Sequence, residues 1–407
     1  MVINFKNIRI GIVGLGYVGL PLAMEFSKAF QVIGYDTNSS RVSDLNNGTD
    51  ITDEGGFGNA QDFLITDKLE RLRECNVYIV TVPTPIDKYK QPNLNPLISA
   101  SREIGQILSM GNVVIFESTV YPGATEEDCI PVLEKHSNLK FNRSFFVGYS
   151  PERVNPGDKT RRLPDIVKVT SGSTPDVAEF ISKLYSVIIK AGVHQAPSIK
   201  VAEAAKVIEN VQRDVNIALM NEIHQIFDKM AIDTQAVISA ASTKWNFMSL
   251  SPGLVGGHCI SVDPYYLLHK SRSKGYIPDL IRTAREINDS MSSFYLNDFI
   301  KSLIKQEISL VDLSVAILGI AFKEDCPDIR NSKVVDLCSG LTDLGINIEI
   351  YDDMVCSKDL LNQYNLELTE NFKNITSNVA ILAVPHQSIL EKIKSSNFEF
   401  VYKIKGE

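Results

Sequence analysis

The sequence predicts an α/β protein with two doubly wound parallel-sheet domains joined by a long central helix. An apolar segment, a glycine-rich turn and a helical pattern follow one another over residues 8–30, and a weaker copy of that pattern begins near residue 315. Residues 198–230 contain neither proline nor glycine and carry apolar residues at helical spacing. At 407 residues the chain exceeds one ordinary core, so several domains are expected.

The first domain is predicted from the order of its elements. Residues 8–13 form an apolar run typical of a buried parallel strand, and the turn Gly14-Leu15-Gly16-Tyr17-Val18-Gly19 follows it. A helical pattern, a second apolar run at 31–35 and Asp36 complete a Rossmann-like unit. The glycines permit close approach of a pyrophosphate to the helix N-terminus. Asp36 can accept hydrogen bonds from a ribose diol and repels a 2′-phosphate, so NAD is predicted rather than NADP.

Three further strands are expected at 76–82, 113–117 and 145–149, and each ends in a loop with polar residues. The carboxyl ends of parallel strands line the ligand crevice of an open α/β sheet. The loop residues predicted to contact cofactor or substrate are Pro83, Thr84, Ser118, Thr119 and Glu152.

One cysteine differs from the others in its surroundings. Cys259 follows Gly256, Gly257 and His258, and Asp263 lies four residues later. Glycines allow a backbone to approach a ligand closely, so Cys259 is predicted to be a nucleophile. The remaining cysteines are expected to be small buried hydrophobes. If the backbone here is extended, His258 points away from the thiol and is a structural or substrate-facing residue rather than its base.

The long helix is expected to carry functional polar residues on one face. Glu203, Lys206, Asn210 and Asp214 recur at three- and four-residue steps. Lys206 has apolar neighbours on both sides, which predicts partial burial. The helix is also a predicted dimer surface.

The C-terminal part repeats the first domain without its full site. Residues 315–321, 348–352 and 378–385 echo the first three strands, and Gly319 retains the first glycine. Ala321 and Glu324 occupy the next two glycine positions. We therefore expect the same topology there, with a site for the mononucleotide part of a substrate.

Composition excludes several function classes. The net charge is −8 and no basic stripe occurs, which argues against nucleic-acid binding. No apolar run approaches the roughly 18 residues of a membrane span, and residues 1–9 lack a signal-peptide core. Six widely spaced cysteines are typical of reduced, cytoplasmic thiols, and the histidines form no metal-binding spacing.

Taken together, these segments resemble the UDP-glucose/GDP-mannose dehydrogenase family over nearly the whole chain. The matching motifs are IVGLGYVGLPLA, TVPTPID, ESTVYPGAT, SPERVNPG, VAEAAKVIENVQRDVNIALMNE, GGHCISVDPYY and AFKEDCPDIRNS. The forms GGHCISVDPYYL and SPERVNPGDK are similar to the branch that acts on UDP-N-acetylhexosamines. The segment TKWNFMSLSPGLVGGHC resembles the UDP-N-acetylglucosamine 6-dehydrogenases of capsule, O-antigen and other surface polysaccharide pathways.

The resemblance implies an NAD-dependent, four-electron oxidation of the sugar C6 hydroxymethyl through a thiohemiacetal and a thioester on Cys259. The implied catalytic residues are Cys259, Lys206, Asn210, Glu152, Asp263 and Thr119. The expected cofactor contacts are Gly14, Gly16, Tyr17, Val18, Gly19, Asp36, Arg41, Pro83, Thr84, Ser118, Thr119 and Arg330. The expected substrate contacts are Glu152, Arg153, Lys206, Asn210, Gly256, Gly257, His258 and Lys323. Lys244, Trp245 and Asn246 are expected near the sugar. Trp245 fits a core position equally well.

The expected domains are an NAD-binding domain at 1–197, a central helical dimerisation domain at 198–300 and a UDP-sugar-binding domain at 301–407. A cytoplasmic homodimer is predicted. The last segment, FEFVYKIK, departs from the family's usual final strand, so the C-terminus is expected to be truncated or divergent.

Three alternatives remain open at this stage. UDP-N-acetylgalactosamine, UDP-N-acetylmannosamine or UDP-glucose would differ from the expected substrate only in small features of the sugar. A sugar-nucleotide epimerase is the second alternative, because Tyr266 and Lys270 have the spacing of its Tyr-x-x-x-Lys pair. The third is an inactive nucleotide-binding protein, which the intact catalytic positions disfavour.

Overall fold

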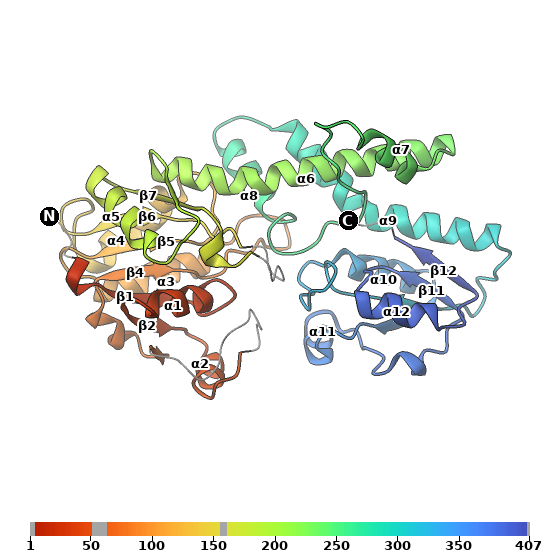
Figure 1. Ribbon diagram of the computed structural model, residues 1–407, viewed down its shortest axis with the longest axis horizontal. Helices are drawn as coiled ribbons and strands as arrows, with labels where there is room; N and C mark the ends of the chain where they lie inside the picture. The colour runs from red at the N-terminus through yellow and green to blue at the C-terminus, as the bar shows by residue number, and fades with distance from the viewer. Residues whose placement is uncertain (1–4, 51–62, 155–160, 405–407) are drawn as a thin grey trace. The chain divides into compact units, whose positions relative to one another are not determined.

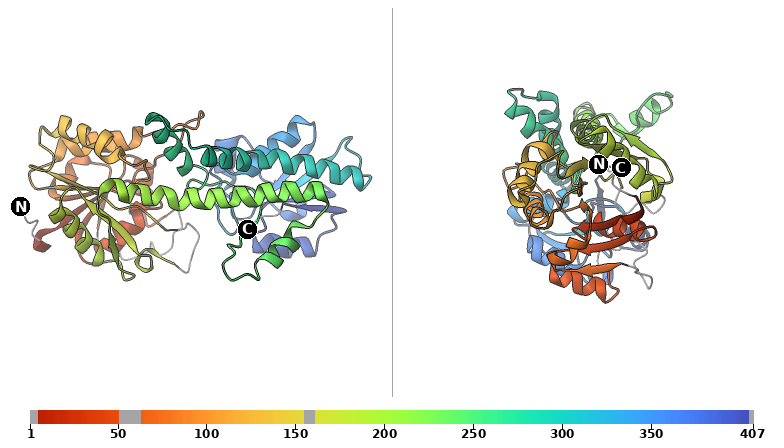
Figure 2. Two further views of the ribbon diagram at one scale, coloured as in Figure 1. Left: turned by 90° about the horizontal axis from the view of Figure 1, so that it is seen from above. Right: turned by 90° about the vertical axis from the view of Figure 1, so that its left-hand side faces the viewer.

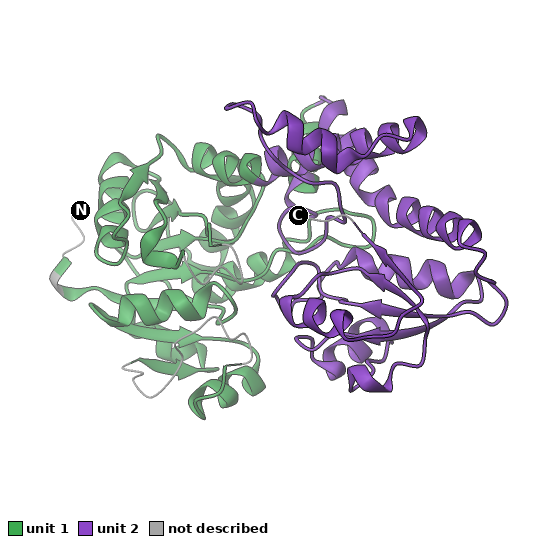
Figure 3. Cartoon of the chain, turned by 45° about the vertical axis from the view of Figure 1, so that its right-hand side comes forward, with its two compact units in different colours: residues 1–209, 265–274 green, residues 210–264, 275–407 purple. Residues whose placement is uncertain are grey.

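The computed structural model describes residues 5–50, 63–154 and 161–404. The chain forms two compact units, one of residues 1–209 and 265–274, the other of residues 210–264 and 275–407 (Figure 3). The domain limits expected from the sequence, at 197/198 and 300/301, stay predictions.

Unit 1 is a Rossmann-like sheet, as predicted. Within the described residues, eight strands pair in the order β3-β2-β1-β4-β5-β6-β7-β8 (Figure 1). The pairs are parallel except that β6 and β7 run antiparallel. The strands are β1 Arg9–Val13, β2 Gln31–Tyr35, β3 Leu64–Thr66, β4 Val77–Val80, β5 Val113–Phe116, β6 Phe146–Tyr149, β7 Lys168–Gly172 and β8 Val193–Gln195.

The strands β3, β7 and β8 were not expected from the sequence. β3 and β8 have three residues each, too few to show a periodic pattern. β7 begins with a charged residue, Lys168, which is buried in the fold. Because Lys168 is charged, β7 does not begin as an apolar run, and a search for apolar runs does not detect it.

The helices of unit 1 cover the sheet. Alternate residues of β1 and β4, among them Ile10 and Ile79, share one hydrophobic core with Leu20 of α1 and Ile181 of α5. The helices are α1 Gly19–Ser27, α2 Ser39–Asn46, α3 Asn95–Ile107, α4 Ile130–Ser137 and α5 Pro175–Ser186. Strand alternation therefore directs one set of side chains into this core.

The predicted long helix is confirmed as α6, Ile199–Met230, which runs without interruption (Figure 2). Two carboxylates on it, Glu203 and Asp214, are fully buried and bind groups of the fold beside them. Glu203 accepts hydrogen bonds from Gly123 N (2.5 Å) and Thr125 N (2.9 Å) in unit 1. Asp214 contacts Arg285 at 2.5 Å in unit 2. The other helices of the central part are α7 Thr234–Ala241, α8 Asp263–Ser273 and α9 Asp279–Lys305.

Unit 2 contains a four-stranded parallel sheet in the order β10-β9-β11-β12 within the described residues. Its strands are β9 Ser314–Leu318, β10 Asn347–Tyr351, β11 Val379–Leu382 and β12 Phe400–Lys403, and its helices are α10 Lys333–Asp343, α11 Ser357–Tyr364 and α12 Gln387–Lys394. This order repeats β2-β1-β4-β5 of unit 1, as the sequence echo predicted. The divergent C-terminal segment thus supplies an ordinary last strand.

Both faces of this second sheet are covered. Val315 and Ile317 of β9 belong to a core that includes residues of α9 and α10. Ala316 and Leu318, the intervening residues, belong to a separate core that includes Ile389 of α12. The alternation of buried side chains explains why β9 reads as a continuous apolar run.

Glu203 makes a testable contribution to pH-dependent stability. Burial, opposed by the hydrogen bonds to Gly123 and Thr125, raises the pKa of Glu203 from 4.5 to about 7. A raised pKa means that the folded state holds the proton more tightly than the unfolded state does. The resulting stabilisation is present below pH 4.5 and is lost as pH rises through 7, and it amounts to about 3 kcal/mol.

We therefore expect the free energy of unfolding of wild type to fall relative to Glu203→Gln between pH 4.5 and 8. Urea unfolding followed by circular dichroism measures both proteins across that range. The pH-dependent contributions of all other titratable groups are the same in both proteins and cancel in the difference between their unfolding free energies. A difference that does not change with pH would contradict the assignment.

Candidate active site

The first glycine turn requires glycine for steric reasons. Gly14 has φ +96°, and a Cβ on Gly19 would lie 1.8 Å from Gly14 O and 2.5 Å from Thr81 Oγ1. A Cβ on Gly16 would meet nothing within 4 Å. No side chain caps the N-terminus of α1. Open space at Gly16 and an uncapped helix N-terminus suit a pyrophosphate.

Asp36 lies at the end of β2 and is oriented by the backbone. Its Oδ2 accepts from Leu15 N (2.8 Å) and its Oδ1 from Asn38 N (2.9 Å). A carboxylate has about four acceptor sites, so acceptor capacity is left for a ribose diol. Arg41 is 7% exposed, and its guanidinium binds Leu15 O and Asp50. Arg41 therefore supports the glycine turn, with Tyr17 and Val18 preceding α1 on the same turn.

The polar loop residues after β4 and β5 bind one another. Thr84 Oγ1 donates to Thr119 O at 2.7 Å, and Ser118 Oγ donates to Val82 O at 2.6 Å. The half-buried Thr119 hydroxyl has no partner among the described residues, and Pro83 is exposed in the same loop. The predicted loops do lie side by side, but several of their hydroxyls stabilise the loops themselves.

Glu152 joins a buried ionic cluster that sequence reasoning missed. Its Oε2 lies 3.5 Å from Lys168 Nζ, and Lys168 binds Glu117 at 2.7 Å. Burial raises the pKa of Glu117, with Lys168 opposing that effect. Burial lowers the pKa of Lys168, but Glu117 and Glu152 outweigh it and raise the pKa overall. The only available signal was a lysine between apolar residues in the sequence DIVKVT.

Lys206 and Arg153 have different surroundings. Lys206 is 8% exposed, as its apolar neighbours predicted, and its ammonium has no partner among the described residues. Arg153 forms an ion pair with Glu209 of α6 at 2.7 Å and donates to Val167 O at 2.7 Å. Lys206 thus retains its donors for a ligand, whereas Arg153 already uses several of its own.

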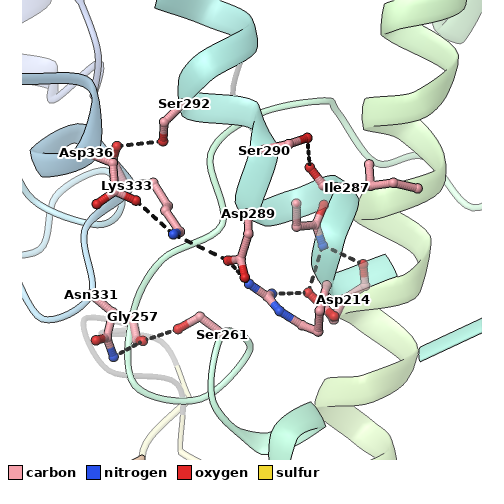
Figure 4. Close-up of polar contacts among 12 residues, drawn as sticks. Asp214, Gly257, Ser261, Ile287, Asp289, Ser290, Ser292, Asn331, Lys333 and Asp336 are labelled. Atoms are coloured by element: carbon pink, nitrogen blue, oxygen red, sulfur yellow. Dashed lines mark hydrogen bonds and ion pairs between the residues drawn. The ribbon is translucent and has the colours of Figure 1, made fainter. Parts of the chain in front are cut away.

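The cysteine loop of unit 2 packs closely on the segment after β9. Gly257 O accepts hydrogen bonds from Asn331 Nδ2 (3.0 Å) and Ser261 Oγ (2.5 Å), as Figure 4 shows. A Cβ on Gly256 would lie 2.7 Å from Asn331 O, and one on Gly257 2.9 Å from the Phe322 ring. The glycines are therefore required for packing within the protein, which the expectation of ligand approach did not include.

Cys259 begins a helical turn. Val262 N and Asp263 N donate to Cys259 O at 3.0 and 2.8 Å, and α8 starts at Asp263. The extended backbone considered for His258 and Cys259 is therefore wrong. Cys259 is half-buried, and Asp263 is 2% exposed. Asn210 Nδ2 donates to Asp263 Oδ2 at 2.5 Å, so the structure brings together two of the predicted catalytic residues.

His258 lies against a carboxylate that it shares with Arg330. Its Nδ1 is 3.4 Å from Asp328 Oδ2, and Arg330 donates to the same oxygen at 2.6 Å. Burial lowers the pKa of His258, but hydrogen bonds with Asp328 and Cys259 outweigh it and raise the pKa to about 9. Arg330 Nη2 also lies 3.1 Å from Nδ1. Because a protonated Nδ1 cannot accept, we assign both cations to Asp328.

The second glycine turn is closed by the protein itself. Gly319 has φ +87°, and Asp352 Oδ2 accepts from Ile320 N (2.8 Å) and from the fully buried His386 Nε2 (3.1 Å). The counterpart of Asp36 is thus occupied by a side chain of its own unit. Lys323 Nζ, in the loop after this turn, lies 5.6 Å from the centre of the Phe322 ring.

Trp245 is 92% exposed, so it does not belong to the core of this unit. Lys244 and Asn246 flank it in the same loop, which joins α7 to the cysteine loop.

Comparison with known proteins gives a family match along the chain. Residues 8–189 match the NAD binding domain of the UDP-glucose/GDP-mannose dehydrogenase family, residues 200–290 its central domain and residues 316–403 its UDP binding domain. The chain belongs to this family. It is therefore an NAD-dependent oxidoreductase that takes a UDP-sugar.

Individual relatives within the family are similar over most of their length. The chain is 53% identical to a UDP-N-acetyl-D-glucosamine 6-dehydrogenase of Pseudomonas aeruginosa over 94% of this chain and 91% of that protein. It is 51% identical to the enzyme of the same name from Salmonella typhi, with the same coverage. The solved UDP-D-ManNAc dehydrogenase of Pyrococcus horikoshii has a TM-score of 0.84 at 28% identity, covering 98% of this chain and 99% of that one.

The residues present fit NAD in this dehydrogenase. The Gly14–Gly19 turn has room for a pyrophosphate, and Asp36 has acceptors for a ribose. Over the described part of the chain, no cluster of three metal-ligating side chains occurs and no helix is long and apolar enough to cross a membrane.

The raised pKa of His258 can be measured directly. We expect the His258 imidazole to titrate near pH 9, and Asp328→Asn to lower that value because a hydrogen bond to the charged ring is removed. NMR of histidine-labelled protein reports each titration, and His258→Gln identifies the resonance. If Asp328→Asn leaves the titration unchanged, Asp328 is not the partner of the imidazole.

Proposed function

We propose that the protein oxidises the C6 hydroxymethyl of UDP-N-acetyl-D-glucosamine to a carboxylate. The observation that carries the proposal is the half-buried Cys259 at the start of a helical turn whose Asp263 is bound by Asn210. The two enzymes at 53% and 51% identity are named for this reaction. Synthesis of a surface polysaccharide is the role expected for the product.

NAD⁺ supplies the hydride acceptor for both oxidation steps. The Cys259 thiolate attacks the C6 aldehyde, and a C–S bond forms as the carbonyl becomes an oxyanion. Lys206, a buried ammonium, and the Asn210 amide stabilise that oxyanion. After the second oxidation the product is a thioester on Cys259. Water attacks its carbonyl and gives one proton to a carboxylate of the site, and the C–S bond breaks with its electron pair on sulfur. The carboxylic acid product loses its proton to solvent, so that a carboxylate and the Cys259 thiolate result.

The hydrolytic water needs acceptors and a fixed position. We assign its orientation to Glu152 and Asp263, with Thr119 as a further contact. Both carboxylates are held by hydrogen bonds from their own unit, Glu152 from Arg153 N at 2.6 Å and Asp263 from Asn210. A restrained carboxylate orients water with little loss of entropy when the reaction occurs.

The remaining predicted contacts are also part of the proposal. Gly14, Gly16, Gly19, Asp36 and the loops after β4 and β5 bind the cofactor, with Arg330 at its diphosphate. Lys323, His258 and the Gly256-Gly257 backbone bind the substrate. His258, a cation near neutral pH, suits a diphosphate or the developing charge on the Cys259 sulfur.

A homodimer is proposed from one exposed face of α6. Val201, Ile208, Leu219, Ile226 and Met230 are 45%, 55%, 48%, 48% and 59% exposed. At 100° per residue all five fall on one stripe of the helix. A second copy of the chain covers this stripe with its own, because a two-fold interface pairs the same surface with itself. The cytoplasm, where thiols stay reduced, is the proposed location.

The reaction is tested by counting NADH. With UDP-N-acetylglucosamine we expect two NADH per sugar consumed, measured at 340 nm, and no sustained turnover by Cys259→Ala because no thioester can form. UDP-GalNAc, UDP-ManNAc and UDP-glucose serve as competing substrates. A higher kcat/KM for one of these would reassign the sugar. Sugar conversion without net NADH would support an epimerase instead.

The dimer is tested by placing charge on the stripe. Ile208→Glu together with Ile226→Glu is expected to yield monomers in light scattering, because burying the new carboxylates costs several kcal/mol. Val311→Glu, a 79% exposed valine outside the stripe, is the matched control and stays dimeric. Dimers of the double variant would rule out α6 as the interface.

A further inference from the structure

The proposed chemistry uses Glu152 but assigns no role to the other residues of the buried ionic cluster to which it belongs in unit 1. Lys168, at the start of β7, has a side chain that is 3% exposed. It lies between Glu117, which is fully buried at 2.7 Å, and Glu152, which is 15% exposed at 3.5 Å. Tyr185 of α5 donates its hydroxyl hydrogen to the other oxygen of Glu117. The cluster therefore runs from the core of the unit to a proposed water-orienting carboxylate.

The cluster places an ammonium in the core, which is costly. Burying a charge is unfavourable unless it is paired, and apolar side chains of the same size fill such a space at lower cost. The two carboxylates outweigh burial and raise the pKa of Lys168, so the ammonium keeps its proton. Its Nζ also lies 5.3 Å from the centre of the Tyr185 ring, a cation–π distance. Lys168 is thus held on several sides as a cation.

The contacts of Glu152 show what the cation does. Glu152 Oε1 accepts from Arg153 N at 2.6 Å and from Val154 N at 2.5 Å. Oε2 faces Lys168. Backbone donors thus fix one oxygen, and the ammonium attracts the other. Without Lys168 the Glu152 carboxylate retains, among the described residues, only the hydrogen bonds to Oε1, so the position of Oε2 is no longer fixed.

We propose that Lys168 is a positioning residue for Glu152, and that Glu117 and Tyr185 hold Lys168 in place. The proposal rests on the function proposed above, in which Glu152 orients the water that hydrolyses the thioester. Lys168 fixes the plane of the Glu152 carboxylate, and hydrolysis is the step that depends on that plane. Glu117 binds the ammonium on the core side and keeps it in one place. Oε2 of Glu152 therefore faces a cation whose position is fixed.

The test separates positioning from folding by comparing two variants. Lys168→Met leaves Glu117 buried without its partner and is expected to destabilise the unit. Glu117→Gln with Lys168→Met removes one charge of each sign, so we expect the unfolding free energy to recover. Turnover does not recover in the double variant, because Glu152 is still unrestrained. Lys168→Arg, which keeps the charge, retains more turnover than either.

The kinetic readout is specific for hydrolysis. In the double variant we expect kcat to fall by about a hundredfold, as for a misplaced reacting group. KM falls with it, because a slow step after formation of the covalent intermediate leaves kcat/KM nearly unchanged. The slow step leaves a thioester on Cys259, which intact-protein mass spectrometry detects as an adduct of the oxidised sugar nucleotide. Glu152→Gln is expected to give the same adduct. Lys183→Met, which removes an exposed lysine paired with Glu179 on α5, is the matched control and leaves kcat unchanged.

Each outcome supports or overturns one statement. A double variant with wild-type kcat, or one without the adduct while Glu152→Gln accumulates it, overturns the role of Lys168. Wild-type protein that fails to form two NADH per sugar overturns the proposed function instead. Lys168→Arg with no more turnover than the double variant also overturns the inference, because the charge would then not be what acts on Glu152.

Discussion

Two carboxylates on α6 lie fully buried, and the positions of the neighbouring polar residues depend on them. Glu203 binds backbone N–H groups of unit 1, and Asp214 binds Arg285 and Asn288 of unit 2. Each contact fixes how the helix is rotated against its own unit. Lys206 follows Glu203 by three residues, and Asn210 precedes Asp214 by four. Residues at these spacings lie on the same face of a helix, so the buried carboxylates fix the direction in which Lys206 and Asn210 point.

The two glycine turns of the protein show how one motif serves two purposes. In unit 1 Asp36 accepts one backbone hydrogen bond on each oxygen and keeps acceptors for a ribose. In unit 2 the corresponding Asp352 also binds the buried His386. His386 Nδ1 in turn accepts from Asp325 N at 2.9 Å, close to Lys323. The second acid thus stabilises the loop that presents Lys323 and does not complete a dinucleotide site.

Paired charges occur at two groups of buried or partly buried site residues. Arg330 and His258 share Asp328. Burial raises the pKa of Asp328, but the hydrogen bonds with His258 and Arg330 outweigh burial and lower that pKa overall. Glu152 and Glu117 share Lys168. A buried charge without a partner is strongly unfavourable, and in these two groups each ion has a partner of opposite charge. These partners are the ones that motif reading did not find.

The sequence by itself determined the order of strands around both glycine turns, the extent of α6 and the identity of the residues in the cysteine loop. Apolar runs, glycine spacing and helical periodicity are local signals, and they act within a few residues of where they are read. The tertiary structure alone decided that Gly256 and Gly257 are needed for contact with Asn331 and Phe322, and that Asp263 meets Asn210. It also placed Lys168 beside Glu152, sixteen residues away, and Glu117, fifty-one residues away. Such pairings arise only when strands far apart in the chain become neighbours, and no local pattern encodes them.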